Sequence, residues 1–238
     1  MACFAANSLL NRAALSGGRM DPVSFTTLRR MGGAVLLGLL SRARGHRPDN
    51  GRLAWGSAIT LFLYAIMFSL AYVRIPASVG ALLLFTAVQI TMIGAVFRAG
   101  ERPRFVEWAG LSLSIGGLVV LTSTGLTRPD FTGTLLMLGA GVGWGVYSLL
   151  GHRGGDAMRV NAVSFVRALP VAVAASAIGA WLGATRLDAA SVILALTCGA
   201  LTTGLGYVVW YAALRGLTAT RAAIVQLSVP LLTAAGGM

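Results

Sequence analysis

The chain has 238 residues, of which 56% are hydrophobic and only 11% are charged. A soluble domain carries about 25% charged residues, so this composition excludes a disordered chain, a nucleic-acid-binding domain and almost any cytosolic enzyme. The formal net charge of +12 comes from 19 arginines without a lysine, and these lie mostly in short clusters between long apolar stretches. A nucleic-acid-binding protein would gather them on one solvated face. The composition therefore predicts a polytopic membrane protein.

Nine apolar segments are candidates for membrane spans. A helix needs about 20 mostly apolar residues to cross a bilayer, and six stretches nearly free of charge meet that length. Three further apolar stretches fit the criterion less well. The first is short, the second carries two arginines, and the third ends at the last residue. In chain order the predicted spans are 2–15, 23–41, 53–73, 75–97, 108–127, 131–155, 168–185, 189–214 and 222–238. Because these runs do not alternate as transmembrane strands do, they predict an all-α polytopic bundle of about nine helices.

The arginines between the spans indicate an orientation. The connections that follow even-numbered spans hold 11 arginines, whereas the opposite side holds 5. Under the positive-inside rule, the arginine-rich connections face the cytoplasm, and so does the N-terminus. The sequence thus predicts a multi-pass protein of the inner (plasma) membrane whose short connections leave no room for a soluble domain.

Metal, redox and proton-carrying groups are scarce in the sequence. Cys3 and Cys198 are single residues in apolar segments, so no metal or cofactor site is predicted. All seven acidic residues fall at or near loops, which leaves no obvious proton carrier inside a span.

The two halves of the chain resemble each other. A shift of 140 aligns 4–10 with 144–150 and 23–25 with 163–165, and a shift of 141 aligns 81–84 with 222–225. This offset covers five spans, an odd number, so the two copies would enter the membrane from opposite sides. Inverted repeats are common in secondary transporters, which bind substrate near the midplane and use alternating access. We predict a first repeat over 1–125 and a second over 130–238.

Five short motifs occur along the chain: Phe-Ala-Ala-Asn-Ser at 4–8, Asp-Pro-Val-Ser-Phe at 21–25, Gly-Glu-Arg-Pro at 100–103, Trp-Tyr-Ala-Ala-Leu at 210–214 and Gln-Leu-Ser-Val-Pro at 226–230. In their order and spacing, these motifs resemble the EamA-type permeases of the drug/metabolite transporter superfamily. The resemblance implies ten helices in two five-helix repeats and transport of small polar metabolites or drugs. Against that pattern, this chain is expected to have a short first helix and to lack the tenth.

Charged residues inside spans are the first candidates for a substrate site. Arg29 and Arg167 are predicted to point their guanidinium groups into the bundle, where each could bind a carboxylate bidentately. The alternative is that each reaches an interface or pairs with helix carbonyls. Arg30 follows Arg29 directly, turns to a different face and is a weaker candidate.

Uncharged polar and aromatic residues supply the other candidates. Gln89 and Gln226 could contact substrate or tie helices together. Asn7 lies one turn before Asn11 on a face of the first span. Trp144 and Tyr147 could form an aromatic wall or could simply pack. The predicted substrate-binding set is Arg29, Arg167, Gln89, Gln226, Asn7, Trp144 and Tyr147.

Two features predict how the helices pack and bend. The glycine-rich run 139–145 is expected to let neighbouring helices approach closely. Pro170 and Pro230 are expected to interrupt their helices.

The predicted function is export of amino-acid-like, anionic or zwitterionic compounds, or of drugs, by a secondary transporter that is not an enzyme. Its partners would be the small-molecule substrate and the lipid bilayer, without nucleic acid, and a homodimer is left open. Two alternatives are a non-transporting structural or regulatory membrane subunit and an intramembrane enzyme that modifies lipids. The enzyme would need a nucleophile–base or metal constellation near the membrane face.

Overall fold

The computed structural model describes residues 1–45, 52–100, 105–123, 130–152 and 156–236, and these ranges contain helices but no strand. The prediction of an all-α bundle is confirmed. The helices are α1 (Ala2–Leu15), η1 (Ser16–Gly18), α2 (Pro22–Ala43), α3 (Arg52–Arg74), α4 (Ala77–Arg98), α5 (Phe105–Ser123), α6 (Phe131–His152), α7 (Ala157–Trp181), α8 (Ala189–Thr197), η2 (Cys198–Leu205), α9 (Gly206–Leu214), α10 (Ala219–Gln226) and α11 (Ser228–Gly236).

Within the described residues, each predicted span overlaps a helix or a run of helices; residues 124–127, 153–155 and 237–238 of three spans lie outside the described ranges. The span at 189–214 is continuous from α8 through η2, a π-helical segment, into α9. The last span is divided into α10 and α11 at Leu227. Pro230 explains the break, because it has no N–H for the carbonyl of Gln226 and its ring crowds that carbonyl. By contrast, α7 runs through Pro170 without a break, so only one of the two expected interruptions occurs.

Helix α7 begins earlier than the span predicted at 168–185. The side chain of Asp156 accepts a hydrogen bond from the backbone N–H of Arg159, at 2.9 Å, and so caps the helix start. The charge of Arg167 does not end the helix, because its guanidinium carbon lies 5.0 Å from the ring centre of Trp55 on α3. A single arginine on an otherwise apolar helix is therefore compatible with an unbroken span.

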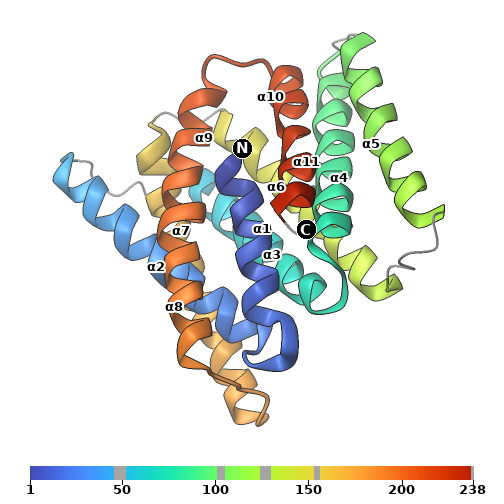
Figure 1. The fold of residues 1–238 in the computed structure, drawn as a ribbon. Coiled ribbons are helices and arrows are strands. Elements are labelled where there is room, and N and C mark those ends of the chain that lie inside the picture. The colour runs from blue at the N-terminus through green and yellow to red at the C-terminus, as the bar shows by residue number, and fades with distance from the viewer. Residues whose placement is uncertain (46–51, 101–104, 124–129, 153–155, 237–238) are drawn as a thin grey trace.

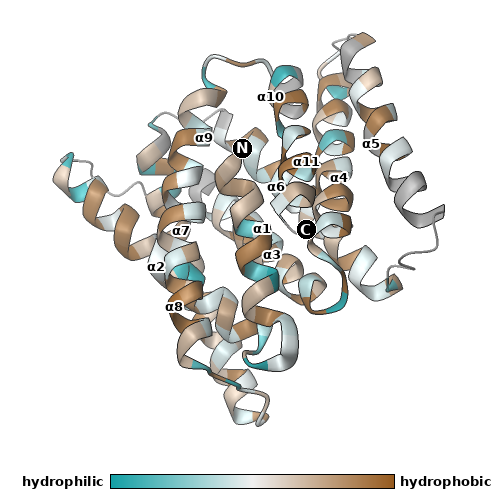
Figure 2. Ribbon diagram, viewed as in Figure 1, coloured by the Kyte–Doolittle hydropathy of each residue, from teal (hydrophilic) through white to brown (hydrophobic). Residues whose placement is uncertain are grey.

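The described helices present apolar side chains outward. Five of them are long and apolar enough to cross a membrane: 55–74, 77–98, 131–151, 158–181 and 189–214. Large side chains on their outer faces and on α2 are more than half exposed, among them Val35, Ile59, Ile193 and Val209. Figure 2 shows brown, apolar segments along the outward-facing helices. This surface suits contact with lipid chains.

The two halves of the chain interlock (Figure 1). Helix α6 packs against α3 and α4, whereas α1 packs against α8, η2 and α11. Helices α2 and α7 pack against each other, and α2 also contacts α8 while α7 contacts α3. The contacts of α1 and α2 with the second half thus mirror those of α6 and α7 with the first half. Helix α5 lies at one edge, against α4 and α10.

Glycines set the closest approaches between helices. A Cβ atom on Gly199 of η2 would lie 2.0 Å from the carbonyl oxygen of Arg29 on α2, and one on Gly141 would lie 2.4 Å from the carbonyl oxygen of Leu84. Only a hydrogen fits at such positions, which is the role of small residues in membrane helix packing. The close packing expected for 139–145 is confirmed, since Gly139 and Gly143 meet α3 while Gly141 and Gly145 meet α4.

The Gly199 contact gives a stability prediction. We expect Gly199→Ala to lower the free energy of unfolding by about 1–3 kcal/mol, because the methyl group must push η2 away from α2. Gly38→Ala is the matched control, since nothing lies within 4 Å of a Cβ on that α2 residue. It should be neutral or slightly stabilising, as alanine favours helix. Denaturant unfolding in detergent measures both, and equal stability of the two variants would contradict the contact.

Candidate functional site

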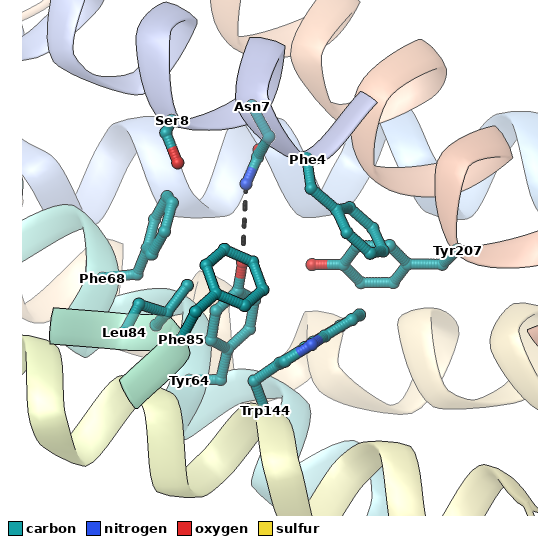
Figure 3. A pocket seen from close by; sticks show the side chains of 9 residues that line it. All are labelled: Phe4, Asn7, Ser8, Tyr64, Phe68, Leu84, Phe85, Trp144 and Tyr207. Atoms are coloured by element: carbon teal, nitrogen blue, oxygen red, sulfur yellow. Dashed lines mark hydrogen bonds between the residues drawn. The ribbon is translucent and has the colours of Figure 1, made fainter. Parts of the chain in front are cut away.

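A small cavity lies where α1, α3, α4, α6 and α9 meet (Figure 3). Its lining is mainly aromatic, with two polar residues of α1 on one side. The lining residues are Phe4, Asn7, Ser8, Tyr64, Phe68, Leu84, Phe85, Trp144 and Tyr207. Its free volume of about 10 Å³ is room for roughly one water molecule. The site is therefore almost closed in this conformation, and both halves of the chain contribute to its wall.

Asn7 connects four elements around this cavity. Its side-chain oxygen accepts hydrogen bonds from the guanidinium Nη1 of Arg29 at 3.1 Å, from Cys198 Sγ at 3.1 Å and from Thr203 Oγ1 at 3.2 Å. Its Nδ2 donates to the hydroxyl of Tyr64, at 3.4 Å, which Figure 3 shows as the dashed line. Asn7 thus joins α1 to α2, α3 and η2, so it ties the first half of the chain to the second.

Arg29 and Arg30 lie behind the cavity wall and are both completely buried. Beyond the bond from Arg29 to Asn7, five guanidinium nitrogens have no hydrogen-bond partner: Nε and Nη2 of Arg29, and Nε, Nη1 and Nη2 of Arg30. Burial of an ionised group is costly unless it is paired and hydrogen-bonded. The pair is therefore a donor-rich, positively charged centre that is not fully compensated.

Aromatic rings provide part of the compensation. The guanidinium carbon of Arg29 lies 5.4 Å from the ring centre of Phe68 and 6.0 Å from that of Phe25. That of Arg30 lies 4.8 Å from the ring centre of Phe165. The negative face of an aromatic ring attracts a cation at these distances. Phe68 also lines the cavity, so only one side chain separates Arg29 from the cavity.

Four aspartates in the described ranges cap the starts of helices. Asp21, Asp130, Asp156 and Asp188 each accept a hydrogen bond from a backbone N–H three residues later, at 2.7–3.1 Å. Capping of this kind is the usual use of aspartate before a helix. In the described part of the chain, neither Arg29 nor Arg30 forms an ion pair. Within these ranges, no carboxylate balances their charge.

The aromatic wall is held in place by a few hydrogen bonds. Trp144 Nε1 donates to Gln226 Oε1 at 2.8 Å, which fixes the indole from α10. The Trp144 ring lies 4.6 Å from Tyr207, 5.3 Å from Tyr64 and 5.3 Å from Phe4, measured between ring centres. The hydroxyl of Tyr207 is buried without a partner. In Figure 3 this hydroxyl points into the space between the labelled side chains.

The structure separates the seven predicted site residues into groups. Asn7 and Trp144 line the cavity, Arg29 touches its wall, and Gln226 supports the wall through Trp144. Tyr147 lies behind Trp144: its hydroxyl donates to Asn161 at 2.9 Å, and its carbonyl accepts from Tyr211 at 2.8 Å.

Gln89 and Arg167 lie away from the cavity. Gln89 is buried on α4 and faces Gly110 on α5. Arg167 is half-buried in an apolar groove between α3 and α7, beside Trp55 and Phe62. Arg167 was expected to point into the bundle interior; in the structure its guanidinium lies beside Trp55, whose side chain is half exposed. Whether either residue binds substrate stays a prediction.

Sequence reasoning undervalued Arg30 and missed Tyr64, Phe68 and Tyr207. The pair Arg29–Arg30 inside one span was a readable signal, since two adjacent charges in a bilayer need an unusual environment. The aromatic residues gave no such signal, because aromatics on apolar helices usually pack or lie at the interface.

The side chains at this site suit anions rather than metal ions. Across the described ranges, no group of three or more His, Cys, Asp or Glu residues could hold a metal ion. The five unpartnered guanidinium nitrogens of Arg29 and Arg30 are hydrogen-bond donors, and guanidinium groups bind carboxylate or phosphate oxygens.

Several known proteins are similar to this chain in sequence. An uncharacterized protein of Pseudomonas aeruginosa is 49% identical over 237 residues, which is all of this chain and 82% of the relative. An uncharacterized transporter of Archaeoglobus fulgidus is 28% identical over 75% of this chain and 63% of its own length. The uncharacterized inner membrane transporter YedA of Escherichia coli K12 is 26% identical over 56% of this chain and 44% of its own length.

A solved crystal structure shares the fold. It superposes with a TM-score of 0.74 over 98% of this chain and 86% of the other, at 21% sequence identity. The family model described as the EamA-like transporter family matches residues 1–123 and again residues 131–237. With its apolar helices and these matches, the chain is a multi-pass membrane protein that belongs to the EamA-like transporter family.

Proposed function

We propose that this protein is a secondary transporter that moves small polar metabolites with a negatively charged group across the inner membrane. The observation that carries the proposal is the pair of fully buried guanidiniums, Arg29 and Arg30, whose remaining N–H groups lack partners beside a closed cavity. A charged group inside a membrane protein that faces other helices commonly marks a substrate pathway. The transporter names of the archaeal and Escherichia coli relatives support the same function.

The proposed mechanism is alternating access between two inverted repeats. The mirrored contacts of α1 and α6 support two copies exchanged by a two-fold rotation, as does the double match to one family model. The repeat alignment pairs Phe4 with Trp144, and the centres of their two rings lie 5.3 Å apart. Equivalent residues next to a two-fold axis are expected to lie this close together. Substrate sites of inverted-repeat transporters lie at such a seam. Rocking one half against the other would open the cavity to each side in turn.

The proposed orientation places the N-terminus in the cytoplasm, and the proposed direction is export. The arginine count supports this orientation, and the Escherichia coli relative is named an inner membrane transporter. The ends of α2 and α7 would then lie on opposite sides of the membrane.

Cysteine labelling tests the orientation. In a Cys3→Ser background, Thr185→Cys places a thiol in the exposed loop after α7, and Ala43→Cys places one at the exposed end of α2. A membrane-impermeant maleimide added to intact cells should label Thr185→Cys at once and Ala43→Cys only after permeabilisation. Cys198 is buried and serves as the internal background. The reverse pattern would overturn the proposed orientation.

Loss of either buried arginine should strongly reduce transport. We expect Arg29→Gln and Arg30→Gln each to reduce export of the anionic substrate at least about tenfold, the effect of losing about 1.4 kcal/mol of binding. Mass spectrometry of the medium, compared between cells with and without the gene, detects the exported compound and measures its rate of export. Arg42→Gln, an exposed charge on the same helix, is the matched control and should keep normal export. Export that survives both substitutions would exclude this site.

Asn7→Asp tests the site by adding a charge. The carboxylate would accept the same hydrogen bonds and form an ion pair with Arg29, whose Nη1 lies 3.1 Å from the present oxygen. We expect the variant to unfold at a higher temperature and to export less substrate, since the protein then supplies its own anion. Thermal unfolding in detergent and the export measurement check the two effects. A variant that exports at the wild-type rate would contradict the proposal.

A further inference from the structure

We infer that the central site takes a compact ligand with two negative charges, a dicarboxylate or a phosphate monoester. The inference rests on the proposed function and names the substrate class of that site. Arg29 and Arg30 are adjacent, fully buried and without an ion pair in the described ranges, so a bound anion must balance two positive charges. A monocarboxylate leaves one of these charges uncompensated in a nonpolar surrounding, at a cost that a dianion avoids.

The unsatisfied groups of the pair itself are hydrogen-bond donors. Five guanidinium nitrogens of Arg29 and Arg30 are buried without partners, and the hydroxyl of Tyr207 points into the adjoining cavity. A dicarboxylate or a phosphate monoester offers only acceptor oxygens, so it could satisfy several donors at once. Bidentate pairing of a guanidinium with a carboxylate or phosphate is the strong form of this contact.

A zwitterionic amino acid fits the same surroundings poorly. Its ammonium group would bring a third positive charge next to Arg29 and Arg30. In the hydrogen-bond network around Arg29, Asn7 Oδ1 already accepts three hydrogen bonds, and the hydroxyl of Tyr64 accepts one from Asn7 Nδ2. The aspartates in the described ranges cap helix starts and form no ion pair with Arg29 or Arg30, so none of them is at hand to balance an ammonium beside the pair.

The position of the pair explains how a ligand would reach it. Asn7, Phe68 and Tyr207 belong to the cavity wall, while Arg29 contacts Asn7 and Phe68 directly from behind. Phe165, which holds Arg30, lies 5.8 Å from the ring of Tyr207. Separation of the two halves along this wall enlarges the cavity toward both guanidiniums.

Binding to the purified full-length protein in detergent tests the charge of the ligand. The probes are two matched pairs: succinate against succinamate, and methyl phosphate against dimethyl phosphate. Each pair differs by one negative charge at similar size, and the two pairs distinguish a dicarboxylate from a phosphate. Thermal unfolding as a function of probe concentration gives the half-saturating concentration. We expect at least one dianion to bind about tenfold or more tightly than its singly charged partner.

Substitution of one arginine should remove that preference. In Arg30→Gln and in Arg29→Gln, the dianion and its partner should bind within about threefold of each other, whereas Arg42→Gln should keep the wild-type preference. Without ligand, both buried-site variants should unfold at or above the wild-type temperature, because an uncompensated buried charge is lost. That readout shows that the variants fold.

Three results would overturn the inference: equal binding of both members of each pair, no stabilisation by any dianion, or a dianion preference that survives both arginine substitutions. Different outcomes separate the ligand class from the proposed transport function. Export that depends on Arg29 and Arg30 but shows no preference for dianions would reject only the ligand class. A dianion preference without any export would reject transport and leave the binding site in place.

Discussion

The burial of two adjacent positive charges on α2 is the constraint on which the centre of this protein depends. An unpaired charge in a nonpolar interior costs far more than an ordinary side-chain contact returns. Here Asn7 supplies one acceptor, and the rings of Phe68 and Phe165 supply cation–π attraction. This compensation leaves five guanidinium nitrogens without partners. A core designed only for stability would have replaced such a pair with apolar side chains of similar volume, so its presence points to a ligand.

The arrangement around the charges follows from unusually close helix contacts. The hydrogen of Gly199 lets η2 approach the backbone of α2 at Arg29, and the π-helical turn of η2 carries Cys198 and Thr203 to the side chain of Asn7. π-Helical turns inside α-helices are frequent at functional sites. Asn7 Oδ1 accepts hydrogen bonds from Arg29 in the first half of the chain and from Cys198 and Thr203 in the second. In the proposed mechanism, relative movement of the halves would therefore change the hydrogen bonds at the same oxygen that Arg29 uses.

Particular residues show how far the sequence could predict the structure. The break before α11 followed from Pro230, and the close contacts of α6 followed from its glycines, since both effects arise from the residue itself. The rotation of α7 did not follow, and Arg167 was expected inside although it lies beside Trp55 at an outer groove. A helix that is apolar on every side has no amphipathic pattern to indicate which face points inward.

The sequence by itself determined the class of the molecule: an all-α membrane bundle and a resemblance to EamA-type permeases that the family match then established. These properties depend on composition, length and order along the chain. Only the tertiary structure decided that Arg30 joins Arg29 at the centre, that Tyr207 completes the cavity wall, and that Gln226 on α10 supports Trp144 on α6. These relations depend on how helices rotate and pack against distant partners, and side-chain contacts across the bundle fix that rotation.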